Sequence, residues 1–158
     1  MPRYADVKVS EICNAIDTAL GEALVTAGVL VRSQSFDELT EGMNDPQTLQ
    51  IYPEEESNVN VTGRTQQSTF GSDPVIEEEI TIRADYYAQA RANIGEDMAA
   101  LVTGVDAIRA NLKTQHCPIF GLAALKTFQW SWRRVVFNYG EPELKYIGAQ
   151  FILKFRVF

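Results

Sequence analysis

His116 is the only histidine, and imidazole is the side chain most often used as a general acid or base near neutral pH. A serine or cysteine nucleophile would need it as a partner. No serine stands in the strand-to-helix turn that is typical of hydrolases. His116 follows an expected helix and precedes Cys117 and Pro118. We therefore interpret it as a loop residue and expect no catalytic residue and no enzymatic activity.

The two cysteines do not suggest a metal site. Zinc takes roughly four ligands, and Cys13 and Cys117 lie far apart in the sequence. The chain also lacks the glycine-rich motifs that hold phosphates or dinucleotides. We expect no metal and no cofactor, and we expect both cysteines to be free, buried thiols.

Two acidic runs, at 54–56 and 77–79, could place paired carboxylates for acid–base or metal chemistry. In an extended strand the central Glu78 points away from its neighbours, so the second run cannot converge on one ligand. We interpret both runs as solvated faces that could contact a partner. The candidate residues are Glu54, Glu55, Glu56, Glu77 and Glu79.

Three arginines complete the candidate interaction residues: Arg64, Arg133 and Arg134. The last two stand among aromatic residues, as in some nucleic-acid surfaces. Two basic residues are too few for such a footprint, and the formal net charge of −7 argues against adhesive binding to nucleic acid.

The first half of the chain contains one long amphipathic pattern and several short ones. Apolar residues spaced by three and four predict a helix over 6–27, ended by Gly28. We expect a short strand at 29–33, a loop at 34–48 and a brief strand at 49–52 that stops at Pro53. Residues 54–74 are polar and predict a long loop.

The second half alternates more clearly. Strands are expected at 75–87, 127–139 and 144–157, the last two as a hairpin, with a helix at 93–114. The alternation changes parity at Arg133–Arg134, which predicts a β-bulge there. Together these elements predict an α+β fold: a mainly antiparallel sheet with two long helices packed against it.

Length and composition fit this single domain. The chain has 158 residues, of which 46% are hydrophobic and 22% charged, as in ordinary globular domains. It contains no apolar run of the roughly 20 residues that cross a bilayer, so we expect no membrane contact. The N-terminus is polar and does not resemble a signal peptide, which predicts synthesis in a cytoplasm.

Several features, in order, resemble the tail terminator family of long-tailed bacteriophages, also called tail completion or minor tail protein U-like. A short strand ends in Ile51-Tyr52-Pro53, and a polar loop leads to the strand Ile80-Thr81-Ile82-Arg83-Ala84. The helix Ile94–Leu112 carries Val105-Asp106-Ala107-Ile108. Two long strands close the chain, and the last begins its alternation after Gly148-Ala149.

The resemblance implies a structural virion protein. Such proteins form a ring, typically a hexamer, that caps the head-proximal end of the tail tube, stops tube polymerisation and joins the tail to the head connector. The expected partners are further copies of this chain, the tail tube protein and the connector or neck proteins. DNA is expected to pass through the channel without specific binding, with the five glutamates above at the channel or on the outer wall.

Three other interpretations remain open at this stage. The chain could be another neck, connector or tail-tube subunit, and a tube subunit would polymerise where a terminator stops at one ring. It could be a small enzyme that uses its acidic residues. It could also be a generic cytoplasmic interaction domain.

Overall fold

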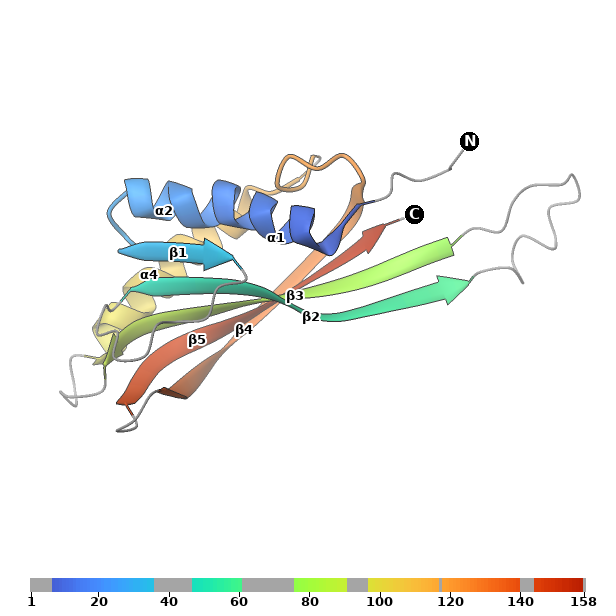
Figure 1. Cartoon of the computed structure of the whole chain (residues 1–158). Helices are drawn as coiled ribbons and strands as arrows, with labels where there is room; N and C mark the ends of the chain where they lie inside the picture. Colours follow the sequence, from blue (N-terminus) through green and yellow to red (C-terminus); the bar gives the residue numbers. More distant parts are fainter. Residues whose placement is uncertain are drawn as a thin grey trace, which may run out of the picture.

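A five-stranded sheet with helices on one side forms the protein (Figure 1). The structure is a computed structural model that describes residues 7–35, 47–60, 76–90, 97–116, 118–139 and 144–157. The strands are β1 (Arg32–Ser35), β2 (Thr48–Asn60), β3 (Ile76–Ala90), β4 (Leu125–Tyr139) and β5 (Leu144–Val157), in the spatial order β1-β2-β3-β5-β4.

The fold is α+β, as the sequence predicts, but the sheet is mixed. β2, β3, β5 and β4 pair in antiparallel fashion, whereas the short β1 pairs parallel to β2. The strands expected at 75–87, 127–139 and 144–157 are present as β3, β4 and β5, and the last two pair with each other.

The helices are less regular than the periodicity predicts. The first region consists of α1 (Val9–Ile16), a π-helical turn η1 (Asp17–Glu22) and α2 (Ala23–Thr26); the second is α4 (Asp97–Lys113). In a π-helical turn the backbone hydrogen bonds run from residue i to i+5 rather than to i+4. This turn contacts both α4 and β1. Within it, the Ala19 carbonyl accepts a hydrogen bond from Asn111 Nδ2 of α4 at 3.1 Å, and Asp17 accepts one from Ser33 of β1.

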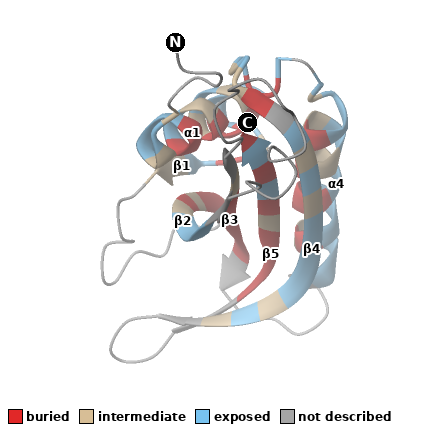
Figure 2. Cartoon of the chain, turned by 90° about the vertical axis from the view of Figure 1, so that its right-hand side faces the viewer, coloured by how far each residue is buried: buried red, intermediate tan, exposed pale blue. Residues whose placement is uncertain are grey.

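One core fills the space between the helices and the sheet. Alternate residues of each central strand point toward the helices and are fully buried, which Figure 2 shows as red bands along β3 and β5. From α1 come Ile12 and Ile16, and from α4 come Leu101 and Ile108. The sheet supplies Ile80, Ile82, Phe151, Leu153 and Phe155.

The expected end of β2 at Pro53 is wrong. The strand continues to Asn60, so the first part of the polar loop expected over 54–74 is a strand paired with β3. The register shifts between Pro53 and Glu55, which leaves Glu54 at a bulge. A bulge accommodates the missing proline N–H without ending the ladder. Residues 61–74 of the expected loop lie outside the described residues.

The β-bulge expected at Arg133–Arg134 is also wrong. Both residues pair in continuous register with β5, and the irregularity of β4 lies between Leu125 and Thr127. The parity change in the sequence has a different cause. Val136 keeps the helix-side position but is 38% exposed, while Phe137 packs on the opposite side of the sheet.

Helix α4 approaches the sheet closely at Gly104. A β-carbon at this position would collide with the ring and hydroxyl of Tyr86, whose side chain is fully buried beneath the helix. Burial raises the pKa of the Tyr86 phenol to about 12. Glycine is therefore required by the approach of α4 to β3, although it weakens the helix by itself.

Truncation of Phe151 tests the core. Phe151 is fully buried in β5, so Phe151→Ala should lower the free energy of unfolding by about 3–5 kcal/mol. Its neighbour Ile152 is only half-buried on the opposite face, and Ile152→Ala should cost less than half as much. Urea unfolding of the two variants measures the difference, and equal losses would contradict the assigned facing of β5.

Substitution of Gly104 tests the helix approach. Gly→Ala inside a helix ordinarily stabilises by about 1 kcal/mol. Gly104→Ala should instead lower the melting temperature, because the new methyl group meets Tyr86. The double variant with Tyr86→Leu should recover part of the loss specific to Gly104→Ala, as a double-mutant cycle would measure. A raised melting temperature in Gly104→Ala would mean that α4 does not pack here.

Candidate functional site

The side of the sheet that faces away from the helices carries the candidate site, which we call the open face. Because strand residues alternate, the neighbours of the core residues point to this side. They are mostly polar or aromatic, and none of the described helices packs on them. Some of them, such as Glu55, Gln129 and Lys154, are exposed and available to a partner, whereas Asp85 and Gln150 at the centre are buried.

A connected group of polar side chains lies at the centre of the open face. Tyr52 donates a hydrogen bond from its hydroxyl to Asp85 Oδ2 at 2.5 Å. Arg83 Nε lies 3.6 Å from Asp85 Oδ1, and Arg83 Nη1 forms an ion pair with Glu54 Oε1 at 3.2 Å. The 3.6 Å approach is too long for a hydrogen bond, so it is an electrostatic contact only.

This group extends across β5 to the far edge of the sheet. Gln150 hydrogen-bonds Asp85, and its Oε1 accepts a hydrogen bond from Arg133 Nε at 3.1 Å. The polar chain therefore connects Glu54 on β2 with Arg133 on β4 through β3 and β5. Asp85 and Gln150 are 4% and 3% exposed, so their polar atoms depend on these partners.

Burial is the largest influence on the pKa values of Asp85 and Tyr52. Desolvation raises the pKa of Asp85 above its ordinary value, although Tyr52, Arg83 and Gln150 each favour the charged form. Desolvation, and then the bond to Asp85, raise the pKa of the Tyr52 phenol. Tyr52 therefore remains a hydrogen-bond donor at neutral pH and acts as a fixed bridge between β2 and β3.

Aromatic packing covers the end of the open face beyond this polar chain. The rings of Tyr87 and Phe137 lie with their centroids 4.4 Å apart, from strands on either side of β5. Gly148 of β5 permits this contact, because a β-carbon there would meet the Phe137 ring and the Tyr86 carbonyl. The glycine of the sequence pattern at 148–149 thus has a packing role.

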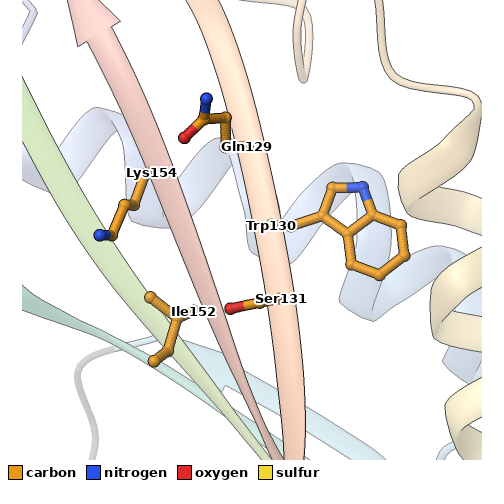
Figure 3. Close-up of a pocket in the computed structure, with 5 residues that line it drawn as sticks. All are labelled: Gln129, Trp130, Ser131, Ile152 and Lys154. Atoms are coloured by element: carbon orange, nitrogen blue, oxygen red, sulfur yellow. The ribbon is translucent and has the colours of Figure 1, made fainter.

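A shallow hollow lies between β4 and β5 at the other end. Figure 3 shows Ser131 and Ile152 toward the same side, with Trp130 directed away from them. Gln129 and Lys154 also line this hollow, and a neighbouring one adds Glu79 and Arg156. Arg156 Nε lies 3.7 Å from Glu79 Oε2, so opposite charges meet here without an enclosed cavity.

Both edges of the sheet are open over part of their length. β4 is an outermost strand, and no described strand pairs with its outer side. On the opposite edge, β1 pairs only with residues 48–51 of β2, which leaves residues 52–60 without an outer neighbour among the described strands. Open edges present backbone donors and acceptors to which another chain can add.

The two edges differ in charge. Glu54, Glu55 and Glu56 are exposed on the open part of β2, whereas Arg133 and Arg134 are exposed on β4. Apolar side chains accompany the basic edge: Trp132 and Val136 of β4, and Met98 and Val102 of α4, are 38–50% exposed. Arg134 Nη1 lies 3.9 Å from Met98 Sδ, which joins the strand and helix parts of this patch.

The structure thus connects some of the sequence candidates and separates others. Glu54 and Arg133 belong to the polar chain, while Glu79 pairs with Arg156 instead. Glu77 lies in β3 opposite Val59, but its side chain is outside the described part. Arg64 lies wholly outside the described residues.

Four residues of the polar chain were not candidates in the sequence: Tyr52, Arg83, Asp85 and Gln150. A charged or amide side chain at the polar position of an alternating strand usually indicates solvent exposure. The available signal was that Arg83 and Asp85 alternate with Ile82, Ala84 and Tyr86 in the middle of a long strand. Strand order, which the sequence does not supply, decides that Gln150 lies beside Asp85.

The other candidate chemistry has no supporting geometry in the described residues. His116 is exposed after α4, and Cys13 is a free, buried thiol whose pKa burial raises to about 12. Cys117 lies outside the described residues. Within the described ranges, no three acidic, histidine or cysteine side chains gather as a metal site would require, and no helix is long and apolar enough to cross a membrane.

Comparison with known proteins gives no family. No protein-family model matches the chain, and no curated protein is significantly similar to it in sequence.

Asp85 should leave a pH signature in stability. Its folded pKa is raised, so the folded state holds a proton that the unfolded state has already released, and the free energy of unfolding falls as pH rises through that interval. The free energy of unfolding of the wild type minus that of Asp85→Asn should therefore decrease as pH rises from about 4, the ordinary carboxyl value. Urea titrations at several pH values measure it, and Glu22→Gln, an exposed carboxylate, is the control. A difference that grows with pH would contradict the dominance of desolvation.

Proposed function

We propose that this protein is a structural virion subunit. Copies of it form a closed ring that caps the tail tube of a long-tailed bacteriophage, ends tube polymerisation and joins the tail to the head connector. The observation that carries the proposal is the pair of open edges on opposite sides of one sheet. Such a domain can bind a copy of itself on each side.

Contacts between two different surfaces of identical subunits generate a ring when the rotation closes. The open part of β2 and the outer side of β4 are two such surfaces, and no symmetry axis relates them. The number six comes from the resemblance to tail terminators. The open face, or the exposed Met98 and Val102 of α4, remains for the tail tube and the connector.

Electrostatics support a conduit for DNA. A channel with clustered basic residues would hold the duplex through its phosphates. The formal net charge of −7 suits a protein past which DNA moves without adhering. Glu54 and Glu79 are paired with Arg83 and Arg156, so they are weaker candidates for the channel wall than the sequence suggests.

A second candidate is a tail-tube or neck subunit. The same open edges favour it, because a contact between different surfaces that does not close produces a helical filament. A tube subunit would grow into filaments with concentration, whereas a terminator would stop at a single ring.

Native mass spectrometry separates these assemblies. We expect a discrete oligomer, most simply of six subunits, in equilibrium with monomer and with no larger series. Electron micrographs of the same sample should show rings. A protein that stays monomeric at high concentration, even when mixed with tail tubes, would overturn the proposal, and filaments of the protein alone would favour the tube subunit.

A further inference from the structure

We propose that the ring is held by a continuous sheet, in which the acidic open part of β2 in one copy pairs with the basic outer edge of β4 in the next. This inference rests on the proposed function and identifies its interface. The partner is a second copy of this chain, because one chain carries both complementary edges.

The acidic edge is available over a useful length. Nine residues of β2, from Tyr52 to Asn60, extend beyond the part that β1 covers. Such a stretch spans about 30 Å at the usual rise per residue. Within it, Glu55 and Glu56 are exposed, and Glu55 pairs with Thr81 on the open face while Glu56 pairs with Ile80 on the helix side.

The basic edge carries its charges in the same arrangement. Arg133 is opposite Gln150 on the open face, and Arg134 is opposite Ala149 on the helix side. With Glu55 opposite Arg133 on the open face of an antiparallel pair, Glu56 lies opposite Trp132 on the helix side and diagonally from Arg134, within reach of its long side chain. Opposite charges that face each other across neighbouring strands stabilise the pairing, and like charges oppose it.

Strand direction agrees with this arrangement. Three successive antiparallel pairings separate β2 from β4, so the two strands run in opposite directions within one copy. A neighbouring copy in the same orientation would thus present β2 antiparallel to β4, and its helices would stay on the same side.

The positions of the charges require neighbouring copies to be displaced relative to each other along the strands. Within one copy Glu55 lies level with Gln129 of β4, across Thr81 and Lys154, and not with Arg133. Bringing Glu55 to Arg133 displaces neighbouring copies by about four residues, or roughly 13 Å, along the strands. A stagger between strands is what closes a sheet into a cylinder.

Apolar contacts accompany the charges. Trp132 is 41% exposed beside the arginines, and it would be covered by the edge of the incoming β2. A long exposed edge strand is a liability unless another chain pairs with it, and Arg133 and Arg134 restrict the choice to an acidic strand.

A charge swap tests the interface. The double variant E55K/E56K should weaken self-association roughly tenfold or more, and R133E/R134E should do the same, because each places like charges across the edge pair. Mixing the two variants should restore the oligomer, with the two kinds of subunit alternating. The quadruple variant that carries all four changes should self-associate like the wild type.

Matched controls change charges elsewhere. Glu22→Lys and Lys113→Glu alter exposed helix residues away from both edges and should leave assembly unchanged. Sedimentation velocity measures assembly, and circular dichroism establishes that each variant is folded. If the wild type forms rings and both double variants form them equally well, the edge pairing is wrong while the ring stands. If the mixture and the quadruple variant both fail to assemble, charge matching does not hold the interface. If the wild type itself stays monomeric, the proposed function fails together with the inference.

Discussion

Coverage of the sheet by helices on one side only is the constraint on which the rest of this structure depends. The buried side is held by ordinary apolar packing around Phe151 and Phe155. Among the described elements none covers the opposite side, and its central polar side chains contact one another, although Arg83 Nε and Asp85 Oδ1 are buried without a hydrogen bond. The chain from Glu54 through Asp85 to Arg133 is the result, and it fixes the four long strands relative to one another.

The open edges of this sheet are surfaces to which another chain can add. The strands run on past the helices, and β2 extends beyond the part that β1 covers. The core and the polar chain connect the two edges of the sheet through all four long strands. The geometry between two binding surfaces determines whether repeated contacts close into a ring. The buried polar chain thus links the two edges that the proposed oligomer would use.

The sequence predicts correctly the helices and strands that have one clearly apolar face and one clearly polar face. Alternation in 144–157 and helical spacing in 93–114 reflect burial against one core, and both elements are present. The prediction from sequence was wrong where the preference of a residue for ending a strand opposes the pairing of that strand with its neighbour. Pro53 would end an isolated strand, but a bulge at Glu54 lets β2 continue because β3 is long enough to pair with it. Likewise Val136 and Phe137 do not reveal which side of β4 is covered, since that depends on where α4 begins, and its first turn lies beside Arg134.

The site was predictable only in its exposed charges. Glu54 and Arg133 are candidates in the sequence because each stands next to residues of the same charge. Their connection passes through Asp85 and Gln150, and the burial of these two side chains depends on the strand order, which the sequence does not supply. The length of tail tubes is the sharpest test of the proposal that this protein ends tube growth as a ring. Tail tube protein should be allowed to polymerise with and without this protein, and the tubes measured by electron microscopy. We expect shorter tubes that carry a ring at one end; tubes of unchanged length with bare ends would rule the proposal out.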